Sequence, residues 1–166
     1  MGKVQEHFFN GSPGAISRSV DDIVISVRNA SDGDIAFGSP VFLDDNGAVP
    51  FTTADPQDFE TFLGFAVRVA DKTPDTYPTG QFNDPPEGAW HAGDVMEVLV
   101  RGSIAIPLSA SGSAGGKLYI RKSDGRMTAS AGAAGTTVLL ENVRIRNPRA
   151  NGAACCEAVI NKRNII

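Results

Sequence analysis

The chain has 166 residues, a length that suits one ordinary domain. Its 18 glycines, 10 prolines and 20% of charged residues argue against a helical bundle or a coiled coil, and its 42% of hydrophobic residues argue against wholesale disorder. No window approaches the roughly 18 apolar residues of a membrane helix, and the net charge of -4 disfavours general nucleic-acid binding. We therefore expect a folded chain of short strands and many turns, with neither a membrane nor a nucleic acid as its partner.

The charged side chains are unevenly distributed along the chain. Residues 1–97 carry 16 acidic and 5 basic side chains, whereas residues 98–166 carry 3 acidic and 10 basic ones. Two interpretations stay open: the strands of one domain intermix these charges in space, or the folded molecule is acidic at one end and basic at the other. A bipolar molecule would orient itself against a charged neighbour or against copies of itself.

The first part of the chain predicts an extended N-terminal arm, residues 1–20. Glycine, serine and proline interrupt its apolar pairs, and the stretch NGSPG at 10–14 cannot hold a helix or a central strand. Val4, Phe8 and Phe9 are unfavourable in water, so they either cover the domain's own core or insert into a partner. The arm lacks the apolar run of a secretory signal, so we expect synthesis in the cytoplasm.

Residues 21–166 are expected to form a single β domain. Short runs in which apolar residues alternate with polar ones predict strands, and no convincing amphipathic helix of three turns is present. Asn46-Gly47 and Asp124-Gly125, each between apolar runs, predict two hairpins whose turn residues tolerate positive φ. The predicted strands are 22–28, 41–43, 48–49, 62–69, 95–101, 103–108, 117–120 and 137–146, while 154–161 stays open as a last strand or a short helix.

Two of these strands carry finer predictions. In the strand at 62–69, strict alternation places Phe62 and Phe65 on opposite faces. In the strand at 137–146, Glu141 shares a face with apolar residues, and its charge predicts a bulge or an edge position.

A long polar connection, residues 71–92, separates two predicted strands. It contains four prolines, which are Pro74, Pro78, Pro85 and Pro86. A connection of this length exceeds the usual loop, so we expect that it is either functional or partly folded through short strands.

The chain offers little of the chemistry that catalysis, cofactors or metals require. Its two histidines, His7 and His91, stand alone. The stretch 109–118 lacks two of the residues that define a phosphate loop, and 44–47 lacks a glutamate at the calcium-loop spacing. The adjacent pair Cys155-Cys156 has no zinc spacing and would point to opposite faces of a strand. We therefore expect no catalytic, cofactor-binding or metal-binding residue and no enzyme activity.

Both ends of the sequence carry apolar residues in otherwise polar surroundings. Terminal apolar residues of this kind are usually held against something. We therefore expect these residues to contact a partner, and they are Val4, Phe8, Phe9, Ile165 and Ile166.

Several features follow one another in a fixed order along residues 20–146. They are DGD at 32–34, GSPVFLDDNGAV at 38–49, FLGFAV at 62–67, AGDVMEVLVRG at 92–102, and GGKLYI at 115–120 with DG at 124–125. In this order the chain resembles the structural cement, or decoration, proteins of tailed-bacteriophage capsids. The resemblance implies a small β-barrel or jelly-roll-like antiparallel core.

The resemblance also implies a function. Such proteins bind outside the phage head, commonly as trimers, and clamp adjoining major capsid subunits, which stabilises the shell. The implied partners are the major capsid protein of the same virus and further copies of this chain in a homotrimer. The implied location is the capsid surface of the virion, after synthesis in the host cytoplasm, and neither enzyme activity nor a cofactor is implied.

Two other functions stay open from the residues. A carbohydrate- or receptor-binding β module of a phage tail or surface structure needs an exposed aromatic platform, for which the chain offers Trp90, Tyr77 and Tyr119. A β-class enzyme such as a trimeric nucleotide hydrolase needs a paired acid and base with a phosphate-binding loop, and the sequence contains no such set.

Overall fold

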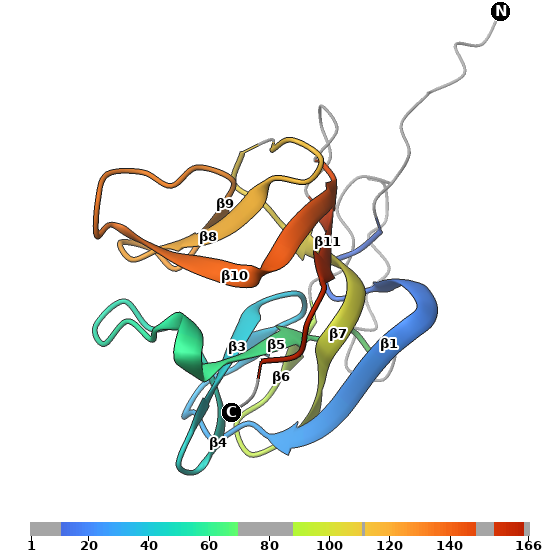
Figure 1. The fold of residues 1–166 in the computed structure, drawn as a ribbon. Helices are drawn as coiled ribbons and strands as arrows, with labels where there is room; N and C mark the ends of the chain where they lie inside the picture. Colours follow the sequence, from blue (N-terminus) through green and yellow to red (C-terminus); the bar gives the residue numbers. More distant parts are fainter. Residues whose placement is uncertain (1–10, 70–87, 111, 149–154, 165–166) are drawn as a thin grey trace, which may run out of the picture.

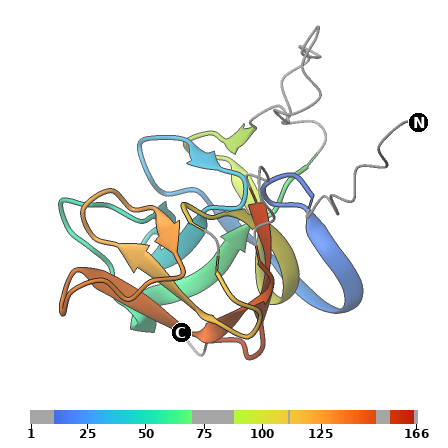
Figure 2. The same ribbon diagram turned by 90° about the horizontal axis from the view of Figure 1, so that it is seen from above.

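The computed structural model describes residues 11–69, 88–110, 112–148 and 155–164 (Figures 1 and 2). Within these ranges the regular structure is β-sheet, apart from one 3-10 turn, η1 (Phe59–Thr61). All strand pairs within the sheets are antiparallel, so the predicted all-β, antiparallel class is confirmed. The described ranges hold no helix with the length and apolar character needed to span a bilayer.

One large sheet and one small sheet make up the fold. The large sheet has the strand order β4-β3-β5-β7-β11-β10-β8-β9, with β1 also paired to β7, and the small sheet joins β2 to β6. The strands are β1 (Ile16–Arg28), β2 (Ile35–Ala36), β3 (Pro40–Asp44), β4 (Gly47–Pro50), β5 (Phe62–Ala66), β6 (Ala89–Trp90), β7 (Val95–Pro107), β8 (Lys117–Arg121), β9 (Met127–Thr128), β10 (Thr137–Asn147) and β11 (Cys155–Ile160).

The long strand β7 joins the two halves of the large sheet. One edge of β7 pairs with β1 between Val95 and Ile104. The opposite edge pairs with β5 at Val98 and Leu99 and with β11 at residues 102–107. Figure 1 shows the halves folded over each other: β3, β4 and β5 form a first layer, and β8, β9 and β10 form a second layer. The sheet does not close, so the β-barrel alternative is wrong, and the two layers agree with the jelly-roll-like alternative.

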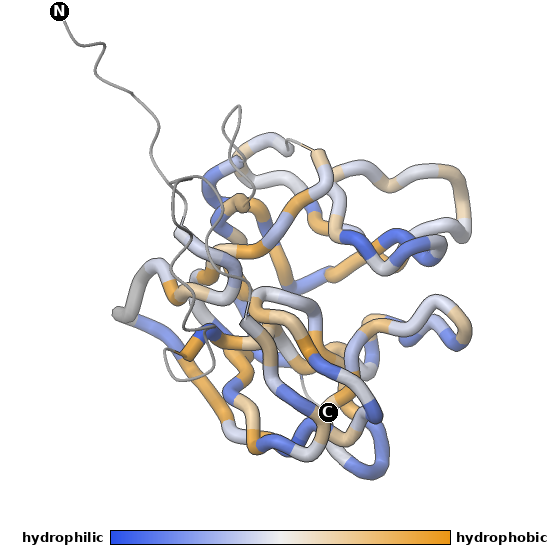
Figure 3. Tube along the Cα trace, turned by 180° about the vertical axis from the view of Figure 1, so that it is seen from behind, coloured by the Kyte–Doolittle hydropathy of each residue, from blue (hydrophilic) through white to orange (hydrophobic). Residues whose placement is uncertain are grey.

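The main core lies between the two layers. Figure 3 shows the hydrophobic residues concentrated along the strands and many of the hydrophilic ones in the turns. The rings of Phe42 and Phe65 both contact that of Phe62, with centroids 5.7 and 5.4 Å from it. A second apolar cluster includes Trp90 of β6 and Met96 of β7. The largest fully buried side chains of the main core are Phe42, Phe62, Phe65, Leu99, Ile104, Ile106, Leu118, Ile120, Leu140 and Ile145.

A glycine allows β7 to pass from one layer to the other. Gly102 has a φ of 120°, which residues with a side chain rarely adopt. Before Gly102, the odd-numbered Leu99 faces the main core, and after it the even-numbered Ile104 and Ile106 do. The side chains that face the core therefore switch from odd to even positions at Gly102. A Cβ atom at Gly102 would lie 2.0 Å from Oδ1 of Asp22 in β1. The sequence predicted two strands broken at this glycine, and the structure joins them into one.

Asp22 occupies the space that Gly102 leaves open. It lies in an irregular part of β1, between the residues that pair with Ser103 and Arg101. Its Oδ1 accepts a hydrogen bond from the backbone N–H of Ser103 at 3.4 Å, and its Oδ2 is buried with no hydrogen-bond partner among the described residues. Burial raises the pKa of the Asp22 carboxyl above its ordinary value, and the charge of Asp21 acts in the same direction.

The predicted opposite placement of Phe62 and Phe65 is wrong. Both rings face the main core, because the pairing of β3 with β5 skips Leu63. Leu63 turns instead into the second apolar cluster. A bulge of this kind puts residues three apart on the same face of a strand.

The remaining strand predictions agree with the structure except at their ends. The β10–β8 register shifts between Leu140 and Arg144, which agrees with the first of the two alternatives predicted at Glu141, a bulge or an edge position. β1 begins at Ile16, so residues 16–20 of the predicted arm are strand. The segment left open at 154–161 contains the strand β11.

The two cysteines at the start of β11 lie inside the protein. Cys155 and Cys156 are both buried, and neither forms a disulfide. Burial raises the pKa of the Cys156 thiol to about 12, so this group stays protonated at neutral pH.

Both predicted hairpins are present, but their turns differ from the expected geometry. Gly47 and Gly125 have positive φ, and no described residue other than glycine does. In the β3–β4 turn the Asp44 carboxylate holds the chain instead, since its Oδ1 accepts the N–H groups of Asn46 and Gly47 at 2.8 and 2.9 Å.

The bend of β7 yields a first prediction. The substitution Gly102→Ala puts a side chain on a residue with an unfavourable φ and displaces the Asp22 carboxylate. We therefore expect the free energy of unfolding to fall by roughly 2–4 kcal/mol. Urea titration measures this loss. The matched control is Gly115→Ala, because Gly115 has a φ of 78° but nothing within 4 Å of the added methyl group. It should cost about 1 kcal/mol. Equal losses would show that the contact with Asp22 is unimportant.

Candidate interaction surface

The residues predicted to contact a partner fall outside the part of the chain that the structure describes. The described residues begin at Gly11 and end at Asn164. The structure therefore locates the attachment points of the two end segments and not the segments themselves. The predicted contact residues concerned are Val4, Phe8, Phe9, Ile165 and Ile166.

The arm is attached through Gly14, between two parts of the sheet. The N–H of Gly14 donates to the carbonyl of Ala105 in β7, and its carbonyl accepts from the N–H of Arg68, beyond the end of β5, both at 2.8 Å. Gly14 is buried with a φ of 77°, and a Cβ there would lie 2.9 Å from the backbone of Ala66 and Arg68. Backbone bonds to two segments thus hold the root of the arm.

The described ends of the 71–92 connection lie beside this root. Residues 70–87 fall outside the described residues. Arg68, which is hydrogen-bonded to Gly14, lies two positions before them in the sequence. At the other end, the carbonyl of Gly88 accepts from the N–H of Phe37 at 3.0 Å. The Cβ of Phe37 lies 2.9 Å from where a Cβ of Gly14 would be. The root of the arm and both ends of the connection therefore gather in one place.

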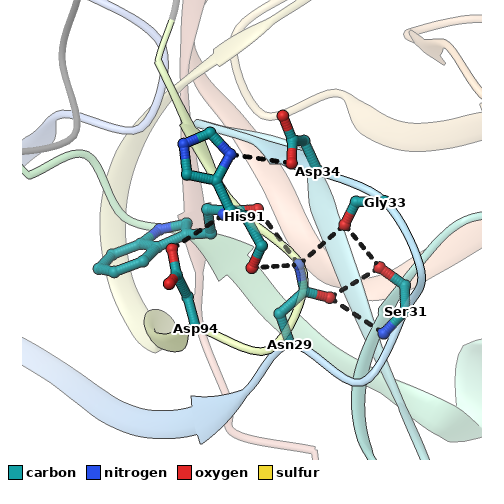
Figure 4. A network of polar contacts seen from close by, with 7 residues as sticks. Asn29, Ser31, Gly33, Asp34, His91 and Asp94 are labelled. Carbon is teal, nitrogen blue, oxygen red and sulfur yellow. Dashed lines mark hydrogen bonds and ion pairs between the residues drawn. The ribbon is translucent and has the colours of Figure 1, made fainter.

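A polar network around Asn29 fixes the loops next to β6 (Figure 4). Asn29 is only 1% exposed. Its Nδ2 donates to the carbonyls of Gly33, Trp90 and His91 at 3.0–3.1 Å. Its Oδ1 accepts from the N–H and the hydroxyl of Ser31 at 3.1 and 2.7 Å. A single side chain therefore joins two loops that are distant in the sequence.

His91 contacts Asp34 at the surface beside this network. Its Nδ1 lies 2.9 Å from Oδ1 of Asp34, and the two side chains are 64% and 56% exposed (Figure 4). The backbone N–H of His91 donates to Oδ2 of Asp94 at 2.9 Å. Such an exposed pair lacks the enclosed setting of a proton-transfer site. The described residues also contain no group of three or more His, Cys, Asp or Glu side chains placed to hold a metal ion.

Trp90 does not supply an exposed aromatic platform. It is 5% exposed, and its indole N–H donates to the carbonyl of Val67 at 2.9 Å. Its ring stands edge-on to that of Phe37, with centroids 6.2 Å apart. Tyr119 is half-buried in β8, and Tyr77 lies outside the described residues. Trp90 therefore packs in the second apolar cluster, which removes the main support for a carbohydrate-binding function.

The uneven charge of the sequence corresponds to the two layers. Residues 1–97 supply β1 to β6 and the start of β7, and residues 98–166 supply the rest. Glu141 and Asp124 are the exposed acidic residues among the described part of the second region. This arrangement favours the bipolar interpretation. The exposed acidic side chains of the first region include Asp32, Asp34, Asp44, Asp45, Asp55, Asp58 and Glu60, and the exposed basic ones of the second include Lys117, Arg126, Arg146, Lys162 and Arg163.

A groove of about 490 Å³ lies between η1 and β10. Phe59, Arg144 and residues 161–164 are among its lining. The Nδ2 of Asn164 donates to the carbonyl of Phe59 at 2.9 Å, and the Nδ2 of Asn142 donates to that of Lys162 at 2.8 Å. The last described residues are thus tied to both layers.

Strand β1 forms an edge of the sheet that the sequence analysis did not single out. Figures 1 and 2 both show it at the outside of the molecule, beyond β7. Its Ile16, Ile23 and Val24 are 37–39% exposed, and Val95 at the start of β7 is 67% exposed. These are the large apolar side chains exposed in the described part of the chain. The sequence signal that could have found Val24 is its place on the face opposite to Ile23, Ile25 and Val27 in the same strand.

The Asn29 network yields a second prediction. Replacing Asn29→Asp keeps the shape but removes the amide donors and sets a carboxylate against three carbonyls, so we expect a loss of about 2–4 kcal/mol in unfolding free energy. Denaturation followed by the fluorescence of Trp90 measures it. The control Asp34→Asn breaks only the exposed pair with His91 and should cost less than about 1 kcal/mol. Similar small losses for both variants would contradict the role of Asn29.

Comparisons with known proteins give one family match and a solved structure with a similar fold. The chain matches the family described as "Structural cement protein (E217 gp24/Pam3 gp6)" over residues 2–161. No curated protein matches it. A solved chain from "The capsid of Myoviridae Phage XM1" has a similar fold, with a TM-score of 0.69 and 19% identity over 97% of this chain and 96% of that chain. Because the family match spans nearly the whole sequence, this chain belongs to the phage structural cement protein family.

Proposed function

We propose that this cement protein binds the outside of a phage head and clamps adjoining major capsid subunits of the same virus. The family match over residues 2–161 is the observation that carries the proposal. The protein acts as a structural component of the virion, synthesised in the host cytoplasm, and not as an enzyme. Its partners are capsid subunits and further copies of itself, not nucleic acid or membrane.

The mechanism is a shift of an equilibrium. A clamp that binds two joined subunits more tightly than separate ones stabilises the joined state by mass action. The stabilisation of the shell therefore depends on contacts to at least two capsid subunits at once. A protein that bound one subunit with the same affinity would not favour the assembled shell.

The apolar end segments are our candidates for these contacts. Burying one large apolar side chain such as that of Phe8 or Phe9 contributes roughly 1.5–3 kcal/mol. The root at Gly14 supports this assignment, because its backbone bonds to Ala105 and Arg68 tie the arm to the sheet. A force that pulls on the arm would therefore be transmitted through these hydrogen bonds to the large sheet. The full set of proposed contact residues is Val4, Phe8, Phe9, Ile165 and Ile166.

A homotrimer would strengthen weak individual contacts. Once one copy of a trimer is bound, the others bind at a high effective concentration, so each arm needs only a modest affinity. A cyclic trimer requires two different, complementary patches on each subunit. The acidic surface of the first layer and the basic surface of the second layer are two such patches, which supports this assembly.

The arm yields a third prediction. Removing residues 1–10 spares Gly14 and its bonds, so we expect a folded protein with unchanged unfolding free energy that no longer loads onto purified heads lacking the cement protein. Co-sedimentation measures the loading, and near-UV circular dichroism measures the fold.

Two double variants of the full-length arm test whether its apolar side chains, and not only its length, are needed for loading. The double variant Phe8→Ala, Phe9→Ala should weaken loading at least tenfold, because it removes most of the apolar area of the arm. The double variant Lys3→Ala, Gln5→Ala should load almost normally. Full loading by the truncated protein would refute the assignment of the arm.

A further inference from the structure

We propose that the outer edge of β1, residues 24–27, pairs with an extended segment of an adjoining major capsid subunit, which adds a strand to the first layer. This inference rests on the proposed capsid-clamping function and assigns one of its contact surfaces.

Hydrogen bonds at the end of β1 show which backbone groups face outward. The N–H of Asn29 donates to the carbonyl of Asp94 at 2.8 Å, and its carbonyl accepts from the N–H of Gly93 at 3.0 Å, so Asn29 faces the β7 side. The register from Val24 to Arg28 is unbroken. Since backbone groups alternate along a strand, the N–H and C=O groups of Val24 and of every second residue after it point away from β7.

The neighbouring strand gives the same orientation independently. Ser26 pairs with Glu97. The carbonyl of Glu97 accepts from the N–H of Val67 at 2.9 Å, on the edge of β7 opposite to β1. Glu97 therefore does not bond Ser26, and the N–H and C=O groups of Ser26 face the free edge.

The free edge has defined limits. Among the described residues, β1 has β7 as its only sheet partner, apart from one bridge between Asn29 and Ala48 in β4. Gly47 covers the free edge at Arg28, because a Cβ atom on Gly47 would lie 2.7 Å from the carbonyl oxygen of Arg28. The last register shift of the β1–β7 pairing lies between Ile23 and Val24 and limits the other end. Residues 24–27, roughly 14 Å of strand, thus stay open for pairing.

This stretch lacks three of the devices that block pairing at a sheet edge, namely lysine, proline and a covering strand among the described residues. A fourth device, irregular pairing, is confined to the part of β1 before Val24. Residues 24–27 read VISV, and the side chains of Ile23 and Val24 are 39% and 38% exposed. The open backbone groups and these two side chains suit an extended partner segment with β-branched or other apolar residues.

The small size of the edge identifies the occupant. Stable complexes between free proteins bury roughly 1,200–2,000 Å² in total, which a strand pair as short as residues 24–27 does not reach. The edge alone would therefore not hold two free copies of this chain together. It suits a partner that other contacts already hold nearby, and a capsid subunit gripped by the arm meets this condition.

The test compares two substitutions at one position on heads that lack the cement protein. Ser26→Pro removes an N–H that the fold of the protein does not use, but that an added strand requires. We expect it to load at least tenfold more weakly than Ser26→Ala, which keeps this N–H. Near-UV circular dichroism establishes whether both variants are folded. Val24→Lys places a charge on the same edge and should weaken loading similarly.

Hydrogen exchange of the wild-type protein gives a readout that does not depend on a variant. The amides of Val24 and Ser26 should exchange freely in solution and at least tenfold more slowly on heads, whereas those of Ile25 and Val27 should be protected in both states. Loading with unchanged exchange at Val24 and Ser26 would overturn this inference and leave the proposed function intact. Absence of wild-type loading would instead contradict the proposed function. Protection in free protein that rises with concentration would identify a second copy as the occupant and overturn the inference as well.

Discussion

The close approach of Gly102 to the carboxylate of Asp22 is the constraint on which the rest of the structure depends. Because Gly102 has no side chain, β1 can stay paired with β7 at the position where the core-facing residues of β7 switch from odd to even numbers. Beyond the bend, the same strand supplies core residues to the second layer. The main core therefore lies between two halves of a single hydrogen-bonded sheet, and the layers cannot slide apart without breaking β7 pairing.

The same strand links the surfaces that we assign to binding. Gly14 holds the root of the arm to β7 at Ala105, and β1, whose outer edge is free, pairs through its inner edge with residues 95–99 of β7. A force applied to either surface passes through backbone hydrogen bonds into the shared strand. This arrangement suits a protein whose task is adhesion under load, for which a rigid body with two or more attachment points serves better than a deep cleft.

The sequence predicts what local chemistry determines. Asn46-Gly47 and Asp124-Gly125 located both hairpins, because turn residues act over a few positions. The shared face of Phe62 and Phe65 depends on the bulge at Leu63, which pairing with a distant strand imposes. The burial of Trp90 likewise depends on the carbonyl of Val67 in another segment. The free edge of β1 was not predicted, since the alternation of Ile23, Ile25 and Val27 is equally typical of a strand with neighbours on both sides.

The most direct test of the clamp is an image reconstruction of purified heads with and without the bound protein. A clamp should give difference density on the outer surface that spans two adjoining capsid subunits, with β1 and the root at Gly14 turned toward the shell. Density that contacts a single subunit, or that lies inside the shell, would contradict it.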